Sequence, residues 1–300
     1  MTLTGAVAAF VKDGDKVTFS GMGGAQCVAH AYEIIRQKKQ DLTLICESPA
    51  EPADMLLGAG CVKRLEVAWV AYAVAGLGYN FRRICEEKIP HEIELEEYSN
   101  YGIALRLQAG AMGVPFLPTK SYHGSDFPKY DKNIRTMNDP YTNELVALVP
   151  AAHPDVALIH CSRADKQGNG QFFGISASGE NAARAAKYTI LTCEKIVGTD
   201  VIRQTPNQTL IPNYTVDAVC EVPFASHPWN MAYEYAYDIP FHAEQLKAFK
   251  TRSGFLEWLD TYCYSAGDWE GYLRQVGFER LHKLHQVEQR FNENAYRGYI

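Results

Sequence analysis

Short apolar segments alternate with segments of helical periodicity along most of this 300-residue chain. The apolar segments are rich in β-branched residues, and several are almost entirely apolar, which is typical of strands covered on both faces of a sheet. They lie at residues 17–20, 42–46, 65–70, 156–161, 189–193 and 216–222. The periodicity between them predicts helices at residues 25–37, 53–58, 80–87, 100–111 and 182–187. This alternation predicts an α/β fold with a doubly wound, mostly parallel open sheet and helices on both faces.

Two regions depart from the alternation. Residues 114–141 are rich in Pro, Gly, Asp, Asn and Tyr and have no clear period, so we expect a long ordered loop there. From residue 252 onward the pattern is helical, and it ends in a charged amphipathic run over residues 279–294. Since no repeat or flexible linker divides the sequence, we expect one domain over residues 1–300, with an α/β core over 1–250 and a helical extension over 251–300.

Composition and charge exclude several classes of protein. The net charge of -6 argues against a nucleic-acid partner, because phosphate binding needs concentrated Lys and Arg. The eight cysteines show neither a C-x-x-C motif nor paired metal-ligand spacing, so we expect reduced thiols, a cytoplasmic location and no metal. The N-terminus lacks a secretory pattern, and no apolar stretch approaches the roughly 20 residues of a membrane helix.

The first candidate site is a glycine cluster between a strand and a helix. Residues 17–20 run into Gly21, Met22, Gly23 and Gly24. Glycines allow a sharp turn with free N–H groups, and a helix start favours negative charge, so an anionic ligand or an oxyanion suits this position. The segment is not a P-loop, because no Gly-Lys-Ser/Thr follows. A tight turn without any ligand explains it equally well.

Three other polar segments each allow two interpretations. Ser99 precedes an amphipathic helix and is a plausible N-cap, which by itself explains the composition of residues 96–102. His123 lies close to Asp126, but a histidine in a loop is more often a structural group than an acid or base. Residues 153–170 form a buried strand ending in a polar turn, which suits either a ligand or a simple turn.

Several segments together occur in the order seen in one protein family. They cover most of residues 5–245, and they are residues 11–15, 41–43, 54–60, 109–118, 153–169, 185–194, 216–219 and 226–228. In this order they resemble the A subunits of type I coenzyme A-transferases, particularly the glutaconate and the larger 3-oxoadipate CoA-transferase branches. One departure is the glycine turn, which is often Gly-Gly-Phe in the family and is Gly21-Met22-Gly23 here.

The resemblance implies a fold shared by CoA-transferases and sugar-phosphate isomerases, and it implies an enzyme. CoA would pass from an acyl-CoA thioester to a carboxylic acid through a glutamyl-CoA intermediate, with no metal. In the family that glutamate looks like a residue of the B subunit, in a Ser-Glu-Asn-Gly motif that this chain lacks. We therefore expect the partner to be a B subunit, in an αβ, α2β2 or larger heteromer. Glu47 is a weaker candidate within this chain, and Glu180 in Ser178-Gly179-Glu180-Asn181 is interpreted as a helix-start residue.

The resemblance also implies binding residues. The glycine turn, Gly21, Met22, Gly23 and Gly24, would contact the thioester or CoA. Ser99, Asn100 and Tyr101 would form the acyl site, and His123, Gly124 and Ser125 would be additions from the loop. Tyr72 and Ala73 lie in an apolar segment, residues 71–78, where glutaconate-type subunits carry small polar residues. This difference favours a bulkier apolar acyl group over the dicarboxylate or 3-oxo acids of the family.

Two alternatives remain open from the sequence. One is a CoA-thioester hydrolase of the same family, of the ring-opening type in steroid breakdown, in which a glutamate of this kind of chain acts at the position of Asn100. An amide cannot serve as that base, which favours the transferase. The other is a non-catalytic ligand-binding subunit, because the fold alone does not determine a function.

Overall fold

The computed structural model describes residues 1–72 and 76–297, with side chains up to residue 290. Nine of the described strands form the main sheet. Its parallel strands follow the order β6 (Glu94–Glu97), β3 (Val62–Val67), β2 (Leu42–Cys46), β1 (Lys16–Phe19), β10 (Val156–Asp165), β12 (Tyr188–Val197) and β14 (Ala218–Glu221). Two short strands, β11 (Gly170–Gln171) and β13 (Thr209–Ile211), continue antiparallel beside the end of β10. All six strands predicted from the sequence are present.

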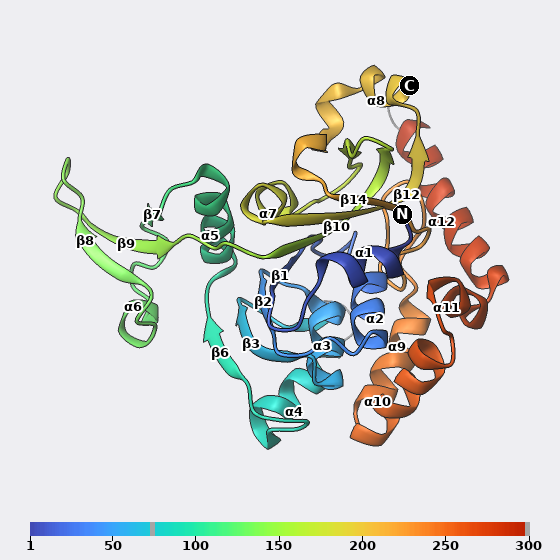
Figure 1. Ribbon diagram of the computed structural model, residues 1–300, viewed down its shortest axis with the longest axis horizontal. Coiled ribbons are helices and arrows are strands. Elements are labelled where there is room, and N and C mark those ends of the chain that lie inside the picture. Colours follow the sequence, from blue (N-terminus) through green and yellow to red (C-terminus); the bar gives the residue numbers. More distant parts are fainter. Residues whose placement is uncertain (73–75, 298–300) are drawn as a thin grey trace.

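The chain order reverses between β1 and β10. Val17 of β1 pairs with Leu44 on one side and with Val156 on the other. From this central pair the chain proceeds outward to β6 in one direction and to β14 in the other (Figure 1). In a parallel sheet the loops at the carboxyl ends of the strands meet beside such a switch point, where ligands bind.

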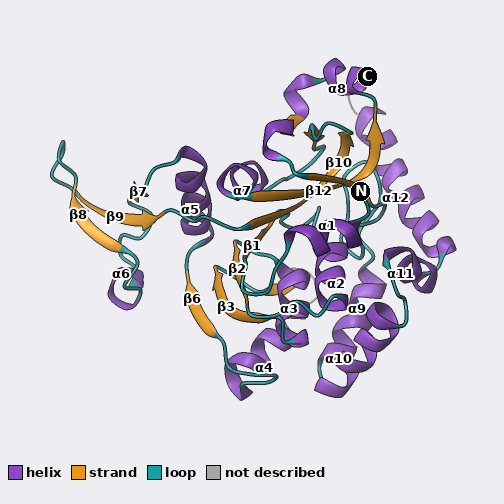
Figure 2. Cartoon of the chain, viewed as in Figure 1, coloured by secondary structure: helices purple, strands orange, loops and turns teal. Residues whose placement is uncertain are grey.

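Helices cover both faces of the sheet (Figure 2). On one face Val156 and Leu158 pack into a core with α1 (Leu3–Phe10), α2 (Val28–Arg36), α3 (Ala50–Ala59), α9 (Ile239–Phe249), α10 (Arg252–Leu259) and α11 (Trp269–Val276). On the other face Ala157 and Ile159 pack with α5 (Asn100–Met112) and α7 (Gly179–Ala185). Successive side chains of one strand thus enter different cores, as a pleated strand requires. The predicted doubly wound α/β fold is confirmed.

The expected loop over residues 114–141 was wrong in part, because this region contributes to an arm. A three-stranded antiparallel sheet in the order β7 (Phe116–Thr119), β9 (Leu145–Pro150) and β8 (Arg135–Asn138) projects from the body together with the short helix α6 (Phe127–Tyr130) (Figure 1). All four residues of β8 are exposed, so no hydrophobic alternation marks this strand. The strands form by pairing with β9, which lies outside the segment.

The remaining elements surround the body. They are the strands β4 (Ala71–Tyr72) and β5 (Gly76–Leu77), the helices α4 (Tyr79–Glu87), α8 (Thr199–Gln204) and α12 (Phe278–Arg297), two 3-10 turns (Pro206–Gln208, Asn213–Thr215) and a π-helical turn (Asp260–Tyr264). The helical tail is confirmed, although the helical region already begins with α9, before the predicted boundary at residue 251. No helix in the described part of the chain is long and apolar enough to cross a membrane.

Candidate functional site

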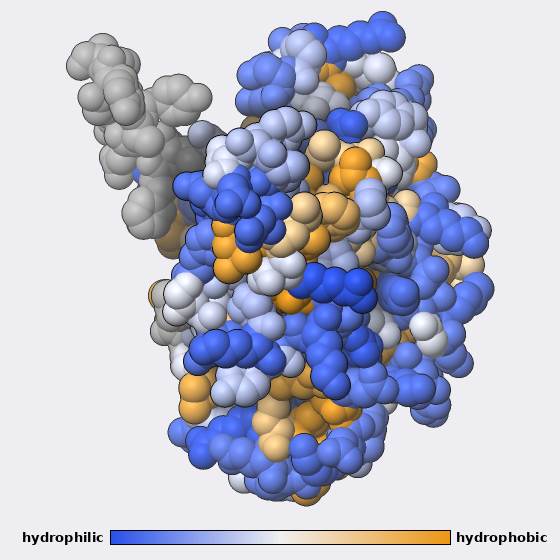
Figure 3. Space-filling view, turned by 90° about the vertical axis from the view of Figure 1, so that its left-hand side faces the viewer, coloured by the Kyte–Doolittle hydropathy of each residue, from blue (hydrophilic) through white to orange (hydrophobic). Residues whose placement is uncertain are grey.

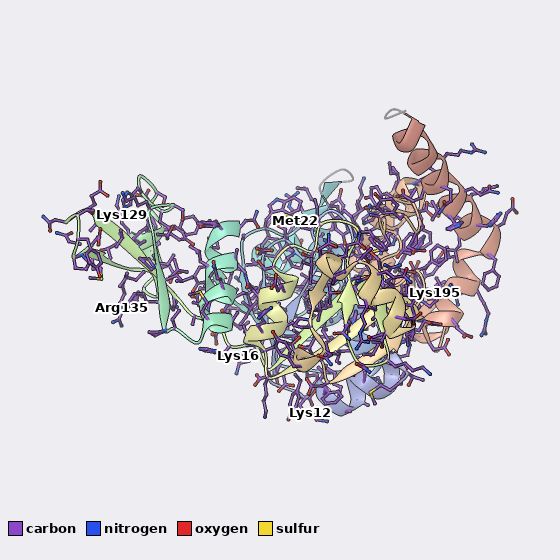
Figure 4. All side chains as sticks on the ribbon, turned by 90° about the horizontal axis from the view of Figure 1, so that it is seen from above. Lys12, Lys16, Met22, Lys129, Arg135 and Lys195 are labelled. Carbon is purple, nitrogen blue, oxygen red and sulfur yellow. The ribbon has the colours of Figure 1, made fainter. Side chains whose placement is uncertain are left out.

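Four loops at the carboxyl ends of β1, β2, β3 and β6 surround a cavity. Its volume is about 580 Å³, and it is lined by Met22, Gly23, Gln26, Ser48, Ala50, Ala68, Trp69, Tyr98, Ser99, Asn100, Phe127 and Trp229. Figure 4 shows Met22 at the edge of the body opposite Lys12 and Lys16, which lie near the start of β1. The cavity therefore occupies the edge of the sheet where ligands of doubly wound folds bind. It brings together four of the residues predicted from the sequence, namely Met22, Gly23, Ser99 and Asn100.

The glycine turn requires glycine at two positions. Gly21 has φ +96°, and a Cβ atom there would lie 2.4 Å from the carbonyl oxygen of Ala25. A Cβ atom on Gly24 would lie 2.9 Å from Oδ1 of Asn230. The turn is held against the chain at residue 230 by the backbone N–H of Ala25, which donates to the carbonyl of Asn230 at 3.0 Å. The sharp turn presents Met22 and Gly23 at the cavity.

Ser99 and Asn100 are fixed by hydrogen bonds at the start of α5. Oγ of Ser99 accepts from the backbone N–H of Gly102 at 2.9 Å, which confirms the predicted N-cap. Oδ1 of Asn100 accepts from Oγ of Ser48 at 2.8 Å, which fixes the orientation of the Asn100 amide. Helix α3 also begins at the cavity, at Ala50. Since helix N-termini carry unpaired N–H groups and a partial positive charge, the two helix starts can stabilise an oxyanion.

The rest of the wall comes from residues that sequence reasoning missed. Trp69, Phe127 and Trp229 supply aromatic surface, and they come from three distant parts of the chain. Gln26 also borders the cavity; its side chain is wholly buried, and neither of its amide atoms has a hydrogen-bond partner among the described groups. A buried amide without a partner is costly. Its position directly after the glycine turn was the available signal for Gln26, whereas nothing in the sequence points to the aromatic residues.

A buried polar cluster lies behind this wall. Glu51, in the first turn of α3, accepts a hydrogen bond from Nε2 of Gln245 at 2.5 Å, and its Oε2 lies 3.6 Å from Nε2 of His242. Burial raises the pKa of Glu51 to about 8 and lowers the pKa of His242 to about 3. Near neutral pH both groups are therefore mostly uncharged. Tyr72 belongs to the same region, because its hydroxyl donates to Asp54 at 3.2 Å and its ring packs edge-on against His242.

The remaining predicted residues lie elsewhere. Tyr72 is buried and does not line the cavity, and Ala73 lies outside the described residues. Tyr101 is exposed and is not part of the wall. Ser125 lines a second cavity of about 630 Å³ between β6 and the arm, while His123 and Gly124 lie exposed in the preceding turn.

Glu47 is engaged in a contact with the opposite side of the sheet edge. Its carboxylate accepts from Oγ of Ser178 at 2.7 Å and from the backbone N–H of Ser178 at 3.4 Å. Burial raises the pKa of Glu47, and the hydrogen bonds from Ser178 offset this only in part. Glu180 lies in the first turn of α7, as predicted. Glu47 is not among the residues that line the cavity.

The polar turn after β10 is explained by its own hydrogen bonds. Asp165 accepts from the backbone N–H groups of Gln167 and Asn169, both at 3.0 Å, and from the Thr199 hydroxyl at 2.9 Å. These bonds satisfy the carboxylate within the turn. A simple turn is therefore favoured over a ligand site in this segment.

Comparison with known proteins identifies the family. A family model described as coenzyme A transferase matches residues 1–222. The chain belongs to the coenzyme A-transferase family. It is 36% identical over 276 residues to the A subunit of 3-oxoadipate CoA-transferase from Pseudomonas knackmussii, with 92% of this chain and 97% of that protein covered. It is 41% identical over 293 residues to an uncharacterised protein of Archaeoglobus fulgidus, of which it covers 65% of the length, with 96% of this chain covered.

The structural comparison agrees with the sequence comparison. The crystal structure of glutaconate coenzyme A-transferase from Acidaminococcus fermentans matches with a TM-score of 0.89 and 31% identity, covering 95% of this chain and 94% of that chain. The family, the fold and the enzymatic class inferred from the sequence are thereby confirmed. Since the relative from P. knackmussii is one named subunit of its CoA-transferase, a B-type partner is implied for proteins of this kind.

Proposed function

We propose that this chain is the A subunit of a heteromeric CoA-transferase that moves CoA from an acyl-CoA thioester to a carboxylic acid. One observation carries the proposal. The cavity at the carboxyl edge combines two helix starts with a lining of amides, hydroxyls and aromatic rings, and its described lining residues include no carboxylate, thiol or imidazole. Such a cavity can bind and polarise a thioester but cannot supply the nucleophile. The nucleophile then comes from the partner subunit.

The reaction divides into two balanced halves. The partner's glutamate carboxylate attacks the acyl carbonyl, the C–S bond breaks, and an acyl–glutamyl anhydride and CoA thiolate form. The thiolate attacks the glutamyl carbonyl, which releases the first carboxylate and leaves a glutamyl-CoA thioester. The acceptor carboxylate then attacks that thioester and displaces the thiolate, which attacks the new acyl carbonyl to give the product acyl-CoA and free glutamate.

In this scheme the present chain binds and stabilises the reacting group. The glycine turn lets the backbone approach the thioester closely, because side chains are absent at Gly23 and Gly24. The starts of α3 and α5 stabilise the negative oxygen of each tetrahedral intermediate. Asn100, held by Ser48, contributes a side-chain amide of fixed orientation.

The arm supports the existence of a partner subunit. It exposes Phe116, Tyr130, Met137, Tyr141 and Leu145, with exposed fractions of 41% to 94%. Figure 3 looks onto the side from which the arm projects and shows hydrophobic patches between hydrophilic areas. Exposed apolar side chains concentrated on a projecting element are typical of protein interfaces. We expect the arm to contact the partner subunit in an αβ, α2β2 or larger assembly.

The test is reconstitution with a B-type chain. The heteromer is incubated with an acyl-CoA and then treated with borohydride, which reduces a glutamyl thioester and blocks turnover. We expect CoA exchange between acids, and inactivation that depends on the acyl-CoA, with the reduced glutamate on the partner chain. Full activity of this chain alone, or the modified residue at Glu47, would refute the proposal. Equal thioester loss without any acceptor acid would favour the hydrolase.

A further inference from the structure

We infer that the acyl group handled by this site has an apolar or aromatic body and carries no second carboxylate. The inference rests on the proposed function and adds the substrate class to it. Its basis is the composition of the cavity wall beyond the two helix starts. It concerns the part of the substrate beyond the thioester carbonyl.

Aromatic and sulfur-containing side chains form much of that wall. Trp69 is 41% exposed and Met22 is 36% exposed, although side chains of this size are usually buried. Both border the cavity together with the half-buried Phe127 and the buried Trp229. Burying this surface against a ligand contributes about 25 cal/mol per Å² of apolar area. A cavity of about 580 Å³ has room for a branched or aromatic acyl group.

Cationic side chains are missing from the described lining. None of the twelve lining residues is Lys, Arg or His. In Figure 4 the labelled Lys12, Lys16, Lys129, Arg135 and Lys195 all lie well apart from Met22. A second carboxylate in this cavity would therefore find no counter-ion within this chain's described part.

One cation contacts the wall from behind, but it is already paired. The Arg106 guanidinium lies 4.4 Å from the ring centre of the lining residue Tyr98. Its Nη1 lies 2.5 Å from Oε2 of Glu66, and both side chains are buried. The acidic residues Glu47 and Glu51 also adjoin the lining residues Ser48 and Ala50 in the chain. The surroundings thus give no excess of positive charge.

The helix starts do not change this conclusion. Every acyl-CoA has a thioester carbonyl, whose oxygen becomes negative during the reaction and occupies the helix starts. A dicarboxylic acyl group would have to place its second carboxylate against the aromatic wall. Burying a charged group without a partner costs more than the 1–3 kcal/mol of a neutral polar group, or roughly 5- to 150-fold in affinity.

The test compares hexanoyl-CoA with adipyl-CoA, which have six-carbon acyl chains and differ by one terminal carboxylate. The reconstituted heteromer is assayed for CoA transfer to acetate and for the dissociation constants of both thioesters. We expect hexanoyl-CoA to have a kcat/KM at least roughly 10-fold higher and to bind correspondingly tighter. Equal or better use of adipyl-CoA would overturn the inference but leave the transferase proposal intact, as would equal binding of both thioesters. No transfer from any acyl-CoA would instead refute the proposed function.

A charge introduced into the wall provides the second test. Trp69→Arg in the heteromer should shift the ratio of the two kcat/KM values toward adipyl-CoA by roughly 10-fold or more, because the guanidinium pairs with the terminal carboxylate. Leu256→Arg is the matched control, since Leu256 is exposed to 47% on α10 and does not line the cavity; it should leave the ratio unchanged. If Trp69→Arg fails to assemble, Met22→Lys replaces it at the same wall. An unchanged ratio in the assembled variant contradicts the inference.

Discussion

Replacing Arg106 by methionine tests how the site helix is held in place. Arg106 lies on α5, whose first turn carries Asn100. Its guanidinium bonds to Glu66 of β3, donates from Nε to the carbonyl of Pro150 at 3.3 Å at the base of the arm, and stacks over Tyr98. One side chain thus connects the sheet, the arm and the cavity wall.

The expected destabilisation follows from the burial of the ion pair. The side chains of Arg106 and Glu66 are exposed to only 9% and 8%. Removing one member of such a pair costs roughly 3–5 kcal/mol, because a buried charge is left behind. Nε of Arg64 also lies 2.8 Å from Glu66 and keeps part of that charge compensated. We therefore expect a loss of about 3 kcal/mol in the free energy of unfolding, at the lower end of that range.

The pH dependence of this loss has a definite sign. Burial acts to raise the pKa of Glu66, but the two arginines outweigh it and hold the pKa below its ordinary value of 4.5. A carboxylate whose pKa is lower in the folded than in the unfolded state stabilises the fold above the unfolded pKa. That contribution is lost as the pH falls through the folded pKa. The difference between wild type and Arg106→Met should thus be largest near neutral pH and shrink below about pH 4.5.

The assay is urea unfolding followed by far-UV circular dichroism for wild type, Arg106→Met, Glu66→Gln and the double variant. The double-mutant cycle should give a coupling energy of about 2 kcal/mol or more. The exposed pair Arg82–Glu86 is the matched control, and Arg82→Met should cost less than about 0.5 kcal/mol. A coupling energy near zero for Arg106 and Glu66 would refute the reasoning.

Three further predictions concern the loops at the cavity. Gly21→Ala should lower kcat/KM of the heteromer roughly 10-fold or more, because the added Cβ would collide with the Ala25 carbonyl and reshape the turn; steady-state kinetics measure this, and unchanged kinetics contradict it. Ser99→Ala should cost about 1 kcal/mol in urea unfolding through loss of the cap bond to Gly102, whereas Ser99→Thr should retain most of it. Glu47→Gln should keep transferase activity and raise the melting temperature at pH 7 but not at pH 4, because a carboxyl whose folded pKa is raised destabilises the fold when it is ionised; loss of activity would make Glu47 a catalyst.

Elements whose sequence pattern matches their burial were predictable. The central strands β2, β10 and β12 are apolar because both of their faces are covered, and their positions were identified closely. The edge strand β6, with the sequence ELEE, was missed because three of its four residues are exposed. The arm was missed for the same reason, since its strands are defined by pairing between distant segments and only weakly by their own composition.

The site was predictable only where a local backbone feature marks it. Gly21 has a positive φ and Ser99 caps a helix, and both requirements restrict the residue type at those positions. Tyr72 was expected at the acyl pocket but donates to Asp54 behind the wall, because the direction of its side chain depends on the packing of α3 and α9. Gln26 follows the glycine turn and yet attracted no attention, since its burial without a partner is a property of the folded chain alone.

By itself the sequence determined the layer architecture, the glycine turn and the helix cap of Ser99, because each depends on periodicity or on the conformation of a few neighbouring residues. Only the tertiary structure decided that Trp69, Phe127 and Trp229 form one wall with Met22 and that no described cation lines it. These side chains meet because parallel strands bring distant loops to one edge of the sheet. That juxtaposition leaves no local pattern along the chain.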